Sequence, residues 1–388
     1  MTRRRISILG STGSIGVSTL DVVAQLGGRD AFEVVTLTGR DNVALLAEQA
    51  KAVGARHAVT SEPRKYAELK ERLAGSGTQA AAGPEALVAL AGEPADLTMA
   101  GIVGIAGLAP TLAAAKAGAT IALANKECLV SGGALFTAEI EKAGSFLLPV
   151  DSEHNAIFQV LDTAQAAAVE RIIITASGGP FRTWPVEKMR DVTPEAAAAH
   201  PNWSMGRKIS IDSASLFNKA LEMIEADRLF GAPGRTLEVV VHPQSVVHSM
   251  VGYTDGSVLA QLGAPDMRTA IGYAIGWPRR PMLDVERLDL IRMARLDFEA
   301  PDEVRFPALR LAREVIAAGG LAGAVLNGAK EVALEAFIAR RIGFLDIAAI
   351  VERVMDRLGA PAATDIETVH EIDRRARAGA AALIAAAP

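Results

Sequence analysis

Short apolar runs alternate with Ala-rich amphipathic stretches along the first 125 residues. The apolar runs predict strands at residues 5–9, 32–38, 58–59, 97–100 and 120–124. The stretches between them predict helices at residues 17–25, 43–53, 84–90 and 107–117. In the first helix, Leu20, Val23 and Ala24 fall on the side expected to be buried. This alternation predicts an α/β fold with a Rossmann-like, doubly wound parallel sheet over residues 1–150.

The regular alternation of predicted strands and helices ends at about residue 150. Apolar runs predict strands at 145–150 and 171–176, a strand pair within 241–250, and a helix at 216–224. Residues 151–280 are therefore expected to form a central α/β domain. The irregular, polar stretch 281–306 predicts a linker. Apolar positions at i, i+3 and i+4 predict four helices, at 307–318, 321–342, 345–358 and 365–386, and their short connections favour an antiparallel bundle over 307–388.

Composition narrows the class of protein. With 388 residues, half of them hydrophobic, the chain is too long for one ordinary core and is globular in character. Its net charge of −5 favours neither a nucleic-acid nor an anionic-membrane partner. The single cysteine, Cys128, excludes an internal disulfide and suits a reducing compartment. The basic start has too short an apolar run for a signal peptide, and no stretch predicts a membrane span, so the protein is expected in the cytoplasm.

A glycine-rich turn directly follows the first predicted strand. Gly10, Gly13 and Gly16 have the G-x-x-G-x-x-G spacing, and a predicted helix follows at once. In this context the pattern is typical of dinucleotide binding, because glycines let backbone N–H groups and the helix N-terminus meet a pyrophosphate. The second strand ends at Gly39-Arg40-Asp41-Asn42, and Arg40 favours NADP(H) over NAD because an arginine there accommodates a 2′-phosphate.

Asp151 and Glu153 follow the apolar run 145–150. If the strand continued through them, both carboxylates would point to one face and could bind one hard cation, Mg²⁺ or Mn²⁺. The alternative is a strand end followed by a helix, with Asp151 or Ser152 capping and Glu153 favoured by the helix dipole. Both interpretations stay open on this stretch alone.

Lys126, at the end of another predicted strand, is a candidate substrate-contacting cation, or else a solvated helix start. Cys128 is a candidate dehydrogenase thiol, although a cysteine in an apolar helix is more often an inert core residue.

Several later segments also favour a site for a phosphorylated substrate. The turn at 177–180 offers a hydroxyl and backbone N–H groups that suit a phosphate, although a plain turn has the same composition. The loop at about 197–207, with Trp203 between Pro and Gly residues, is a candidate lid or a loop pinned to the core. Residues 212–215 are expected to cap the helix at 216–224, in which Asn218, Lys219 and Glu222 share one face. None of the histidines has zinc-site spacing.

Taken together, these segments resemble the 1-deoxy-D-xylulose 5-phosphate reductoisomerase family. The matching segments span most of the first 280 residues in the family's order: 10–16, 125–127, 149–155, 175–181, 200–206, 211–225, 242–250 and 265–268. The resemblance implies rearrangement and NADPH-dependent reduction of 1-deoxy-D-xylulose 5-phosphate to 2-C-methyl-D-erythritol 4-phosphate, in the non-mevalonate isoprenoid pathway. It also implies a homodimer and a catalytic Mg²⁺, Mn²⁺ or Co²⁺.

The resemblance further implies a role for individual residues. Metal ligands would be Asp151, Glu153 and Glu222. The substrate phosphate would be bound by Ser177, Ser213, Asn218 and Lys219. The reacting end of the substrate would meet Lys126, Ser152, Glu153, His200 and the lid residue Trp203, with Lys126, His200 and the three metal ligands as catalytic residues. The cofactor would be lined by Thr12, Gly13, Ser14, Ile15, Gly39, Arg40, Asn42, Asn125, Glu127 and Gly206.

Two positions depart from the family's usual pattern. The second strand end differs from the common Ala-Gly-x-Asn, which affects the expected 2′-phosphate contacts. Lys330 stands where Asn is usual, outside the expected catalytic set. Two other functions compete with the reductoisomerase: an NADP-dependent semialdehyde dehydrogenase that uses Cys128 and needs no metal, and a non-catalytic NADP-sensing protein. EDTA should abolish the activity of a reductoisomerase but not that of the semialdehyde dehydrogenase. The sensing protein should bind NADPH without turnover.

Overall fold

The computed structural model describes residues 3–203, 206–231 and 234–386. The chain divides into two compact units. The first unit comprises Met1–Cys128, Phe136–Asn155 and Asp266–Glu286, and the second comprises Leu129–Leu135, Ala156–Pro265 and Arg287–Pro388. Every helix within the described residues is too short or too polar to traverse a lipid bilayer.

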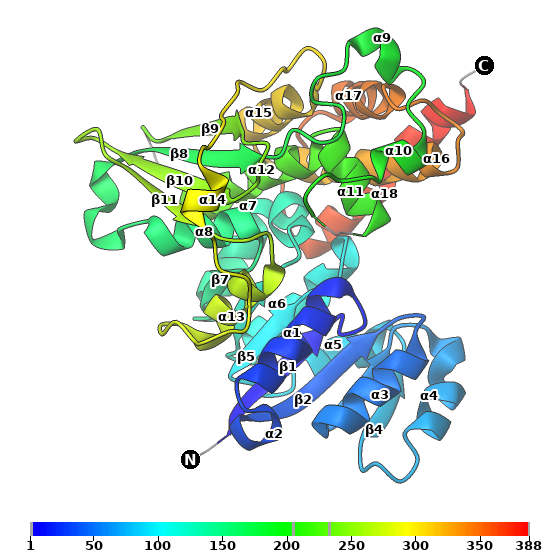
Figure 1. Cartoon of the computed structure of the whole chain (residues 1–388). Helices are drawn as coiled ribbons and strands as arrows, with labels where there is room; N and C mark the ends of the chain where they lie inside the picture. Colours follow the sequence, from blue (N-terminus) through cyan, green and yellow to red (C-terminus); the bar gives the residue numbers. More distant parts are fainter. Residues whose placement is uncertain (1–2, 204–205, 232–233, 387–388) are drawn as a thin grey trace. The chain divides into compact units, whose positions relative to one another are not determined.

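The first unit is built on a seven-stranded sheet whose strands are all parallel (Figure 1). Its spatial order is β4-β3-β2-β1-β5-β6-β7, so the order reverses between β1 and β5. The strands are β1 Arg4–Leu9, β2 Phe32–Gly39, β3 His57–Thr60, β4 Gln79–Ala82, β5 Leu97–Ala100, β6 Thr120–Leu123 and β7 Leu147–Pro149. The predicted doubly wound sheet is confirmed. The sequence patterns missed β4 because its run of alanines has neither β-branched nor aromatic residues.

Helices connect these strands, and the four predicted between the strands up to β6 are present as α1, α3, α5 and α6, with small shifts in their ends. The helical elements are α1 Ser14–Gln25, α2 Gly28–Ala31, α3 Val43–Val53, η1 Pro63–Lys65, α4 Tyr66–Arg72, α5 Pro84–Ala91, η2 Ile105–Gly107, α6 Leu108–Lys116, α7 Glu127–Lys142, α8 Ser152–Val160 and α13 Met267–Gly276. α7 and α8 have residues in both units. α13, which was not predicted, packs against α1.

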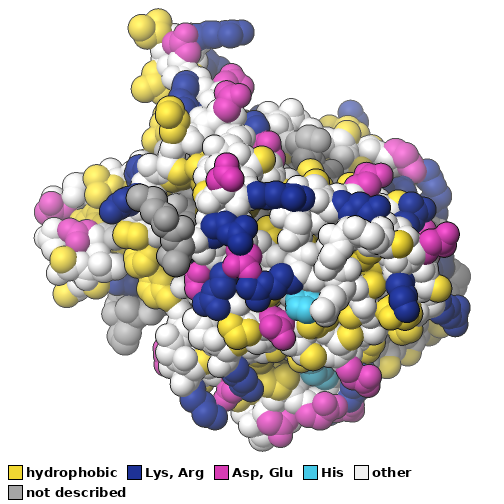
Figure 2. All heavy atoms as spheres, turned by 90° about the horizontal axis from the view of Figure 1, so that it is seen from below, with side chains coloured by type: hydrophobic (Ala, Val, Ile, Leu, Met, Phe, Trp, Pro, Cys, Tyr) yellow, Lys and Arg dark blue, Asp and Glu magenta, His cyan; other side chains and the backbone are white. Residues whose placement is uncertain are grey.

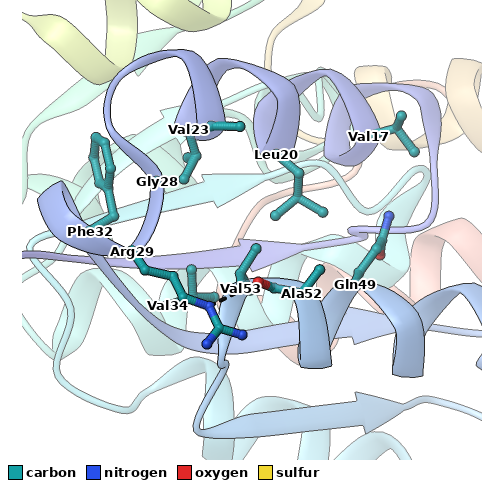
Figure 3. Close-up of a pocket in the computed structure, with 11 residues that line it drawn as sticks. Val17, Leu20, Val23, Gly28, Arg29, Phe32, Val34, Gln49, Ala52 and Val53 are labelled. Carbon is teal, nitrogen blue, oxygen red and sulfur yellow. Dashed lines mark hydrogen bonds between the residues drawn. The ribbon is translucent and has the colours of Figure 1, made fainter.

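The helices α1 and α3 lie side by side over β2 and border a pocket of about 380 Å³ (Figure 3). Leu20, Val23 and Ala24 all line it, but only Val23 is buried, so the expectation for Leu20 and Ala24 is wrong. The amphipathic pattern indicates the right face of α1. That face stays partly open because α1 and α3 do not close against each other. None of the predicted cofactor residues lines this pocket.

The second unit contains a four-stranded mixed sheet in the order β11-β10-β8-β9. Its strands are β8 Val169–Ala176, β9 Thr236–Val241, β10 Val247–Tyr253 and β11 Val258–Leu262. β8 pairs with β9 in parallel, and β10 runs antiparallel to both β8 and β11. The predicted strand pair within 241–250 is the end of β9, a turn and the start of β10. β11 was missed because its exposed positions lack a clear alternation.

Helices make up the rest of the second unit. They are η3 Thr163–Ala168, α9 Val186–Met189, α10 Pro194–Ala197, α11 Arg207–Ala214, α12 Phe217–Phe230, α14 Leu290–Met293, α15 Ala308–Ala318, α16 Ala322–Ile338, α17 Asp346–Leu358 and α18 Ile366–Ala385. The four predicted C-terminal helices are confirmed, and α16 packs against both α17 and α18. The predicted linker is less irregular than expected, because it contains α14 and Glu299 pairs with Val241 of β9.

Charged side chains of both signs are interspersed on the face of the molecule seen in Figure 2. Basic and acidic groups alternate there over short distances, with no extended field of one sign on that face. This distribution agrees with the modest net charge of −5.

Candidate active site

The glycine-rich turn lies at the carboxyl end of β1, where the strand order of the first sheet reverses. Gly10 has φ +84°, and a Cβ there would lie 2.7 Å from the Gly101 carbonyl oxygen, beyond the end of β5. A Cβ on Gly16 would lie 2.3 Å from Ser11 Cα. Glycine is therefore required at both positions. Gly13 precedes α1 without a side-chain cap, so the N-terminus of α1 can meet an anion.

Buried hydrogen bonds hold this turn against the neighbouring elements. Ser11 N–H donates to the Thr38 carbonyl at 2.7 Å, and Ser11 Oγ donates to Gln49 Oε1 of α3 at 2.8 Å. Gln49 Nε2 donates back to the Ser11 carbonyl at 2.9 Å. The predicted cofactor residues Thr12 to Ile15 follow directly, so they stand on a fixed support.

The end of β2 lies beside the same turn. A Cβ on Gly39 would lie 3.2 Å from the Thr12 side chain. Arg40 is largely exposed, with Nε 3.6 Å from Asp41 Oδ2. Asn42 caps α3, since its side chain accepts from Leu45 N–H at 3.1 Å. The four predicted residues Thr12, Gly39, Arg40 and Asn42 are thus gathered at one edge of the sheet, and the guanidinium of Arg40 is accessible there.

Asn125 and Cys128 serve the local structure at the start of α7. Asn125 is 3% exposed, and its Nδ2 donates to the Gly104 carbonyl at 2.9 Å. Its Oδ1 accepts from Cys128 N–H at 2.8 Å. Cys128 itself is fully buried. A thiol without solvent access agrees with the inert-core interpretation and gives no support to the dehydrogenase.

Asp151 and Glu153 stand at a helix start, so of the two interpretations left open the helix cap is confirmed and the strand is wrong. β7 ends at Pro149 and α8 begins at Ser152. Asp151 Oδ1 accepts from Glu153 N–H at 3.2 Å, as a capping carboxylate does. The helical conformation is favoured because the cap gives the Glu153 N–H group a hydrogen-bond acceptor. The cap uses Oδ1, whereas Oδ2 of Asp151 faces Lys126 Nζ at 2.9 Å.

Charged and polar partners surround Asp151 within the first unit. Lys126 Nζ lies 2.9 Å from Asp151 Oδ2, and both side chains are largely buried. His154 Nδ1 lies 3.3 Å from Asp151 Oδ1. Ser152 Oγ donates to Glu153 Oε2 at 2.6 Å. The structure therefore brings together Lys126, Asp151, Ser152 and Glu153, which were predicted from three separate signals.

In the second unit, the turn after β8 depends on two glycines with positive φ. Gly178 has φ +80° and Gly179 has φ +68°. A Cβ on Gly179 would lie 2.9 Å from Ala214 Cα and 3.2 Å from the Ser213 carbonyl oxygen. The turn that carries Ser177 therefore packs closely against the end of α11, which carries Ser213. Two of the predicted phosphate-binding hydroxyls thus lie on adjoining segments.

His200 links this turn to the predicted lid. Its Nε2 lies 2.9 Å from Ser177 Oγ, and its Nδ1 accepts from Trp203 N–H at 2.9 Å. Because Nδ1 accepts, the neutral ring carries its hydrogen on Nε2 and donates to the hydroxyl. Burial lowers the pKa of His200 below its usual value, which favours this neutral form.

The loop predicted to be a lid or a pinned loop is held by its own polar and aromatic side chains. Asn202 Nδ2 donates to Ser245 Oγ at 3.2 Å, and the Trp203 ring lies 5.9 Å from the His248 ring, between centroids. Gly206 stands at the N-terminus of α11. Residues 204 and 205 of the predicted lid lie outside the described residues. The place of His248 near Trp203 depends on the strand pairing of β10, which no local signal in the sequence reveals.

The expected capping cluster at 212–215 is wrong. Asp212 to Ala214 end α11 instead, and α12 starts at Phe217 after Leu216 in the left-handed conformation, φ +60°. Ser215 Oγ donates back to the Ile211 carbonyl at 3.0 Å, so it satisfies the preceding helix rather than the following one.

The predicted polar face of α12 is present. Asn218 Nδ2 and Lys219 Nζ both donate to the carboxylate of Glu222. Lys219 and Glu222 are 4% and 1% exposed, so this is a buried cluster rather than a solvated stripe. One further buried charge, Lys330 of α16, lies 2.9 Å from Asp212 and was not expected to take part.

Comparisons with known proteins agree with this geometry. The family described as 1-deoxy-D-xylulose 5-phosphate reductoisomerase matches residues 6–133, and its two C-terminal domain families match residues 147–230 and 262–379. The reductoisomerase of Rhizobium meliloti (strain 1021) is 65% identical over 383 residues, which cover 98% of each chain. That of Sinorhizobium medicae (strain WSM419) is 66% identical with the same coverage.

Two solved structures extend the similarity to the fold. The reductoisomerase of Zymomonas mobilis in complex with NADPH is 52% identical, with a TM-score of 0.94 over 100% of both chains. A DOX-P reductoisomerase in complex with NADPH, fosmidomycin and magnesium is 41% identical, with a TM-score of 0.94 over 98% of both chains. These matches cover both units, and the chain therefore belongs to the 1-deoxy-D-xylulose 5-phosphate reductoisomerase family.

Proposed function

We infer that this chain converts 1-deoxy-D-xylulose 5-phosphate to 2-C-methyl-D-erythritol 4-phosphate with NADPH and a divalent metal, as an enzyme of isoprenoid precursor synthesis. One observation carries this inference. The glycine-rich turn after β1 and the Lys126–Asp151 pair beside β7 lie at the carboxyl edge of a single parallel sheet. Ligands of doubly wound sheets bind at this edge. A dinucleotide and a metal carboxylate are therefore available on the same rigid support.

NADPH fits the first unit through its pyrophosphate and its ribose phosphate. The backbone N–H groups around Gly13 and the start of α1 would hold the pyrophosphate. The exposed guanidinium of Arg40 supports a contact to the 2′-phosphate. When bound, the cofactor supplies the hydride for the reduction. Thr12, Ile15, Gly39, Asn42, Asn125, Glu127 and Gly206 complete the proposed cofactor contacts.

The donor set fits a hard divalent cation. We propose Asp151, Glu153 and Glu222 as its ligands, all of them carboxylates, which suits Mg²⁺ or Mn²⁺ rather than zinc. Within each unit an ammonium now stands beside one of these carboxylates: Lys126 beside Asp151, and Lys219 beside Glu222. Both carboxylates therefore lie where positive charge is favourable. When bound, the metal supplies Lewis-acid stabilisation of developing negative charge on the substrate oxygens.

The phosphate of the substrate is assigned to the second unit. Ser177 and Ser213 lie on segments in close contact, and Asn218 and Lys219 begin the next helix. Hydroxyls, an amide and an ammonium are the groups that bind a phosphate. Binding there, away from the reacting carbons, supplies free energy for orienting the substrate.

The reacting end of the substrate is assigned to Lys126, Ser152, Glu153 and His200, with Trp203 closing over it. Neutral His200 can donate a hydrogen bond from Nε2, the atom that now faces Ser177 Oγ. Lys126 supplies positive charge beside Asp151. The lid would exclude water while the cofactor reduces the rearranged aldehyde.

The Asp151→Asn substitution tests this function. Mutation of a residue that supports a metal ligand typically lowers metal affinity or activity by about 10- to 100-fold. Removing a ligand itself should therefore lower Mn²⁺-dependent turnover by at least about 100-fold. NADPH binding should stay unchanged, because the glycine-rich turn is untouched. The measurement is NADPH oxidation with 1-deoxy-D-xylulose 5-phosphate, with Asp255→Asn in an exposed turn as the matched control. Full turnover by Asp151→Asn, or by the wild type in EDTA, would contradict the proposal.

Three further statements belong to the proposal. We propose a cytoplasmic enzyme, since a lone buried cysteine suits a reducing compartment. We propose a homodimer formed through β11, an edge strand with exposed Val258, Leu259 and Leu262. The functional division into a cofactor part (1–150), a catalytic part (151–280), a linker (281–306) and a helical bundle (307–388) is proposed as well.

A further inference from the structure

Lys330 and Asp212 form a buried ion pair in the second unit. Lys330 Nζ lies 2.9 Å from Asp212 Oδ2, and the side chains are 4% and 10% exposed. Lys330 belongs to α16 and Asp212 to the last turn of α11, 118 residues away in the chain, and these two helices pack together. Charged side chains are seldom buried to this degree unless they are paired. The pair therefore stabilises both buried charges.

Asp212 stands next to the groups assigned to the substrate phosphate. It directly precedes Ser213 in α11. The Ser177 turn packs against that same end of α11, since a Cβ on Gly179 would lie 3.2 Å from the Ser213 carbonyl oxygen. Asn218 and Lys219 follow in the first turn of α12. A carboxylate thus lies one residue from a proposed binding site for a dianion.

We propose that Lys330 is a positioning residue for phosphate recognition: it neutralises Asp212 and fixes the end of α11, so that Ser213 is presented without a repelling negative charge beside it. This inference rests on the proposed function, because it assigns the phosphate to Ser177, Ser213, Asn218 and Lys219. Lys330 acts through Asp212 and does not itself contact the phosphate.

The physical reason is the low dielectric around the pair. A buried carboxylate repels a nearby phosphate more strongly than an exposed one, because little water screens it. A lysine at 2.9 Å cancels most of that field. Binding of the phosphate then depends on the net charge of the pair. Loss of Lys330 leaves a negative net charge, whereas loss of the Asp212 carboxylate leaves a positive one.

A purely structural pair would behave differently. If the ion pair only joined α11 to α16, loss of either partner would weaken the site in the same direction. Lys208 and Glu335 offer a matched comparison, because they bridge the same two helices at 2.7 Å but are exposed, at 58% and 56%. Lys208→Met therefore tests the effect of losing an α11–α16 bridge without a buried carboxylate being left behind.

The test compares Lys330→Met, Asp212→Asn, the double variant and Lys208→Met. For each, KM and kcat for 1-deoxy-D-xylulose 5-phosphate and the inhibition constant of inorganic phosphate are measured, with urea unfolding as a check on folding. Lys330→Met should raise KM and the phosphate inhibition constant roughly 10- to 100-fold, with a smaller change in kcat. Asp212→Asn should leave both constants within about 3-fold or lower them, and the double variant should return close to the wild type.

The contrary results are equally definite. A rise of similar size in Lys330→Met and Asp212→Asn, or a double variant as weak as Lys330→Met, would overturn the proposal. If Lys330→Met does not fold, Asp212→Asn and the double variant decide it, since a 10-fold rise of the phosphate constant in either one contradicts charge compensation. Absence of turnover and of phosphate inhibition in the wild type would instead refute the proposed function.

Discussion

Burial alters the acid–base behaviour of two histidines near the lid. It lowers the pKa of His200 below its usual value, and it lowers the pKa of His248 to about 4, with Lys219 and His242 adding to the effect. The backbone hydrogen bonds at Gly263 and Ala264 act in the opposite direction but are outweighed by burial. Both rings are therefore neutral at physiological pH. The His248 ring lies 5.9 Å, between centroids, from the ring of Trp203 in the proposed lid.

Stability should fall as the pH is lowered from about 6.5 to about 4. In this window the unfolded chain protonates His248 at its ordinary pKa, whereas the folded chain does not, so protons favour unfolding. At 1.36 kcal/mol per pKa unit the loss for this one residue is up to about 3 kcal/mol. The measurement is the urea unfolding free energy across this pH range.

Comparison with His248→Gln isolates the contribution of that ring. The variant should lose less stability over the window than the wild type, while His370→Gln, a half-buried surface change, should follow the wild type. Identical pH profiles for His248→Gln and the wild type would contradict this assignment.

At the scale of elements, the Gly178–Gly179 turn determines how β8 meets α11. Positive φ at both residues reverses the chain within a short space, and the missing Cβ of Gly179 lets the turn contact Ala214. The same contact holds Ser177 beside the end of α11. The geometry of the proposed phosphate site therefore depends on the absence of a side chain at Gly179.

Gly179→Ala should destabilise the protein by about 2–4 kcal/mol, because left-handed backbone strain adds to a backbone clash at 2.9 Å. It should also raise KM for the phosphosugar more than it lowers kcat, since the turn carries Ser177. Unfolding in urea and steady-state kinetics measure the two effects.

Gly256→Ala is the matched control. Gly256 has a similar φ of +87° in the turn between β10 and β11, but a Cβ there meets nothing within 4 Å. It should cost only about 1 kcal/mol and leave KM unchanged. Equal losses in the two variants would mean that close contact with α11 is not important.

At the scale of the whole molecule, the two edges of the second sheet differ. β9 is covered at one point by Glu299, which pairs with Val241. β11 forms the other edge, and within the described residues it pairs only with β10. Apolar side chains Val258, Leu259 and Leu262 are exposed along it. An exposed apolar edge strand is a surface that proteins usually cover, which supports self-association there.

Leu259→Lys should weaken that self-association by roughly 10- to 100-fold in the dissociation constant, since an interface core excludes unpaired charges. Sedimentation velocity over a range of protein concentrations measures it. Val304→Lys, at an exposed residue outside this sheet, is the control and should sediment like the wild type. A Leu259→Lys variant with unchanged sedimentation would exclude β11 as the dimer edge.

Local patterns determined much of this protein before any contact was known. The βα alternation, the glycine spacing at 10–16 and the four C-terminal helices were all predicted correctly, because each follows from periodicity or turn chemistry within a few residues. The shared face of Asn218, Lys219 and Glu222 was predicted for the same reason, since helical spacing alone sets it. Strand β4 and the start of α12 were not predicted correctly, because contacts with neighbouring segments determine their conformation more strongly than their weak local preferences do.

Only the tertiary structure decided how distant residues act on one another. It placed Lys126 on Asp151, His200 on Ser177 and Lys330 on Asp212, and it turned Asp151 into a helix cap where the local pattern also allowed a strand. These pairs lie 23 to 118 positions apart, or depend on which end of a helix is satisfied. Residue spacing carries no information on such contacts, because burial and charge pairing are settled only when separate segments pack together.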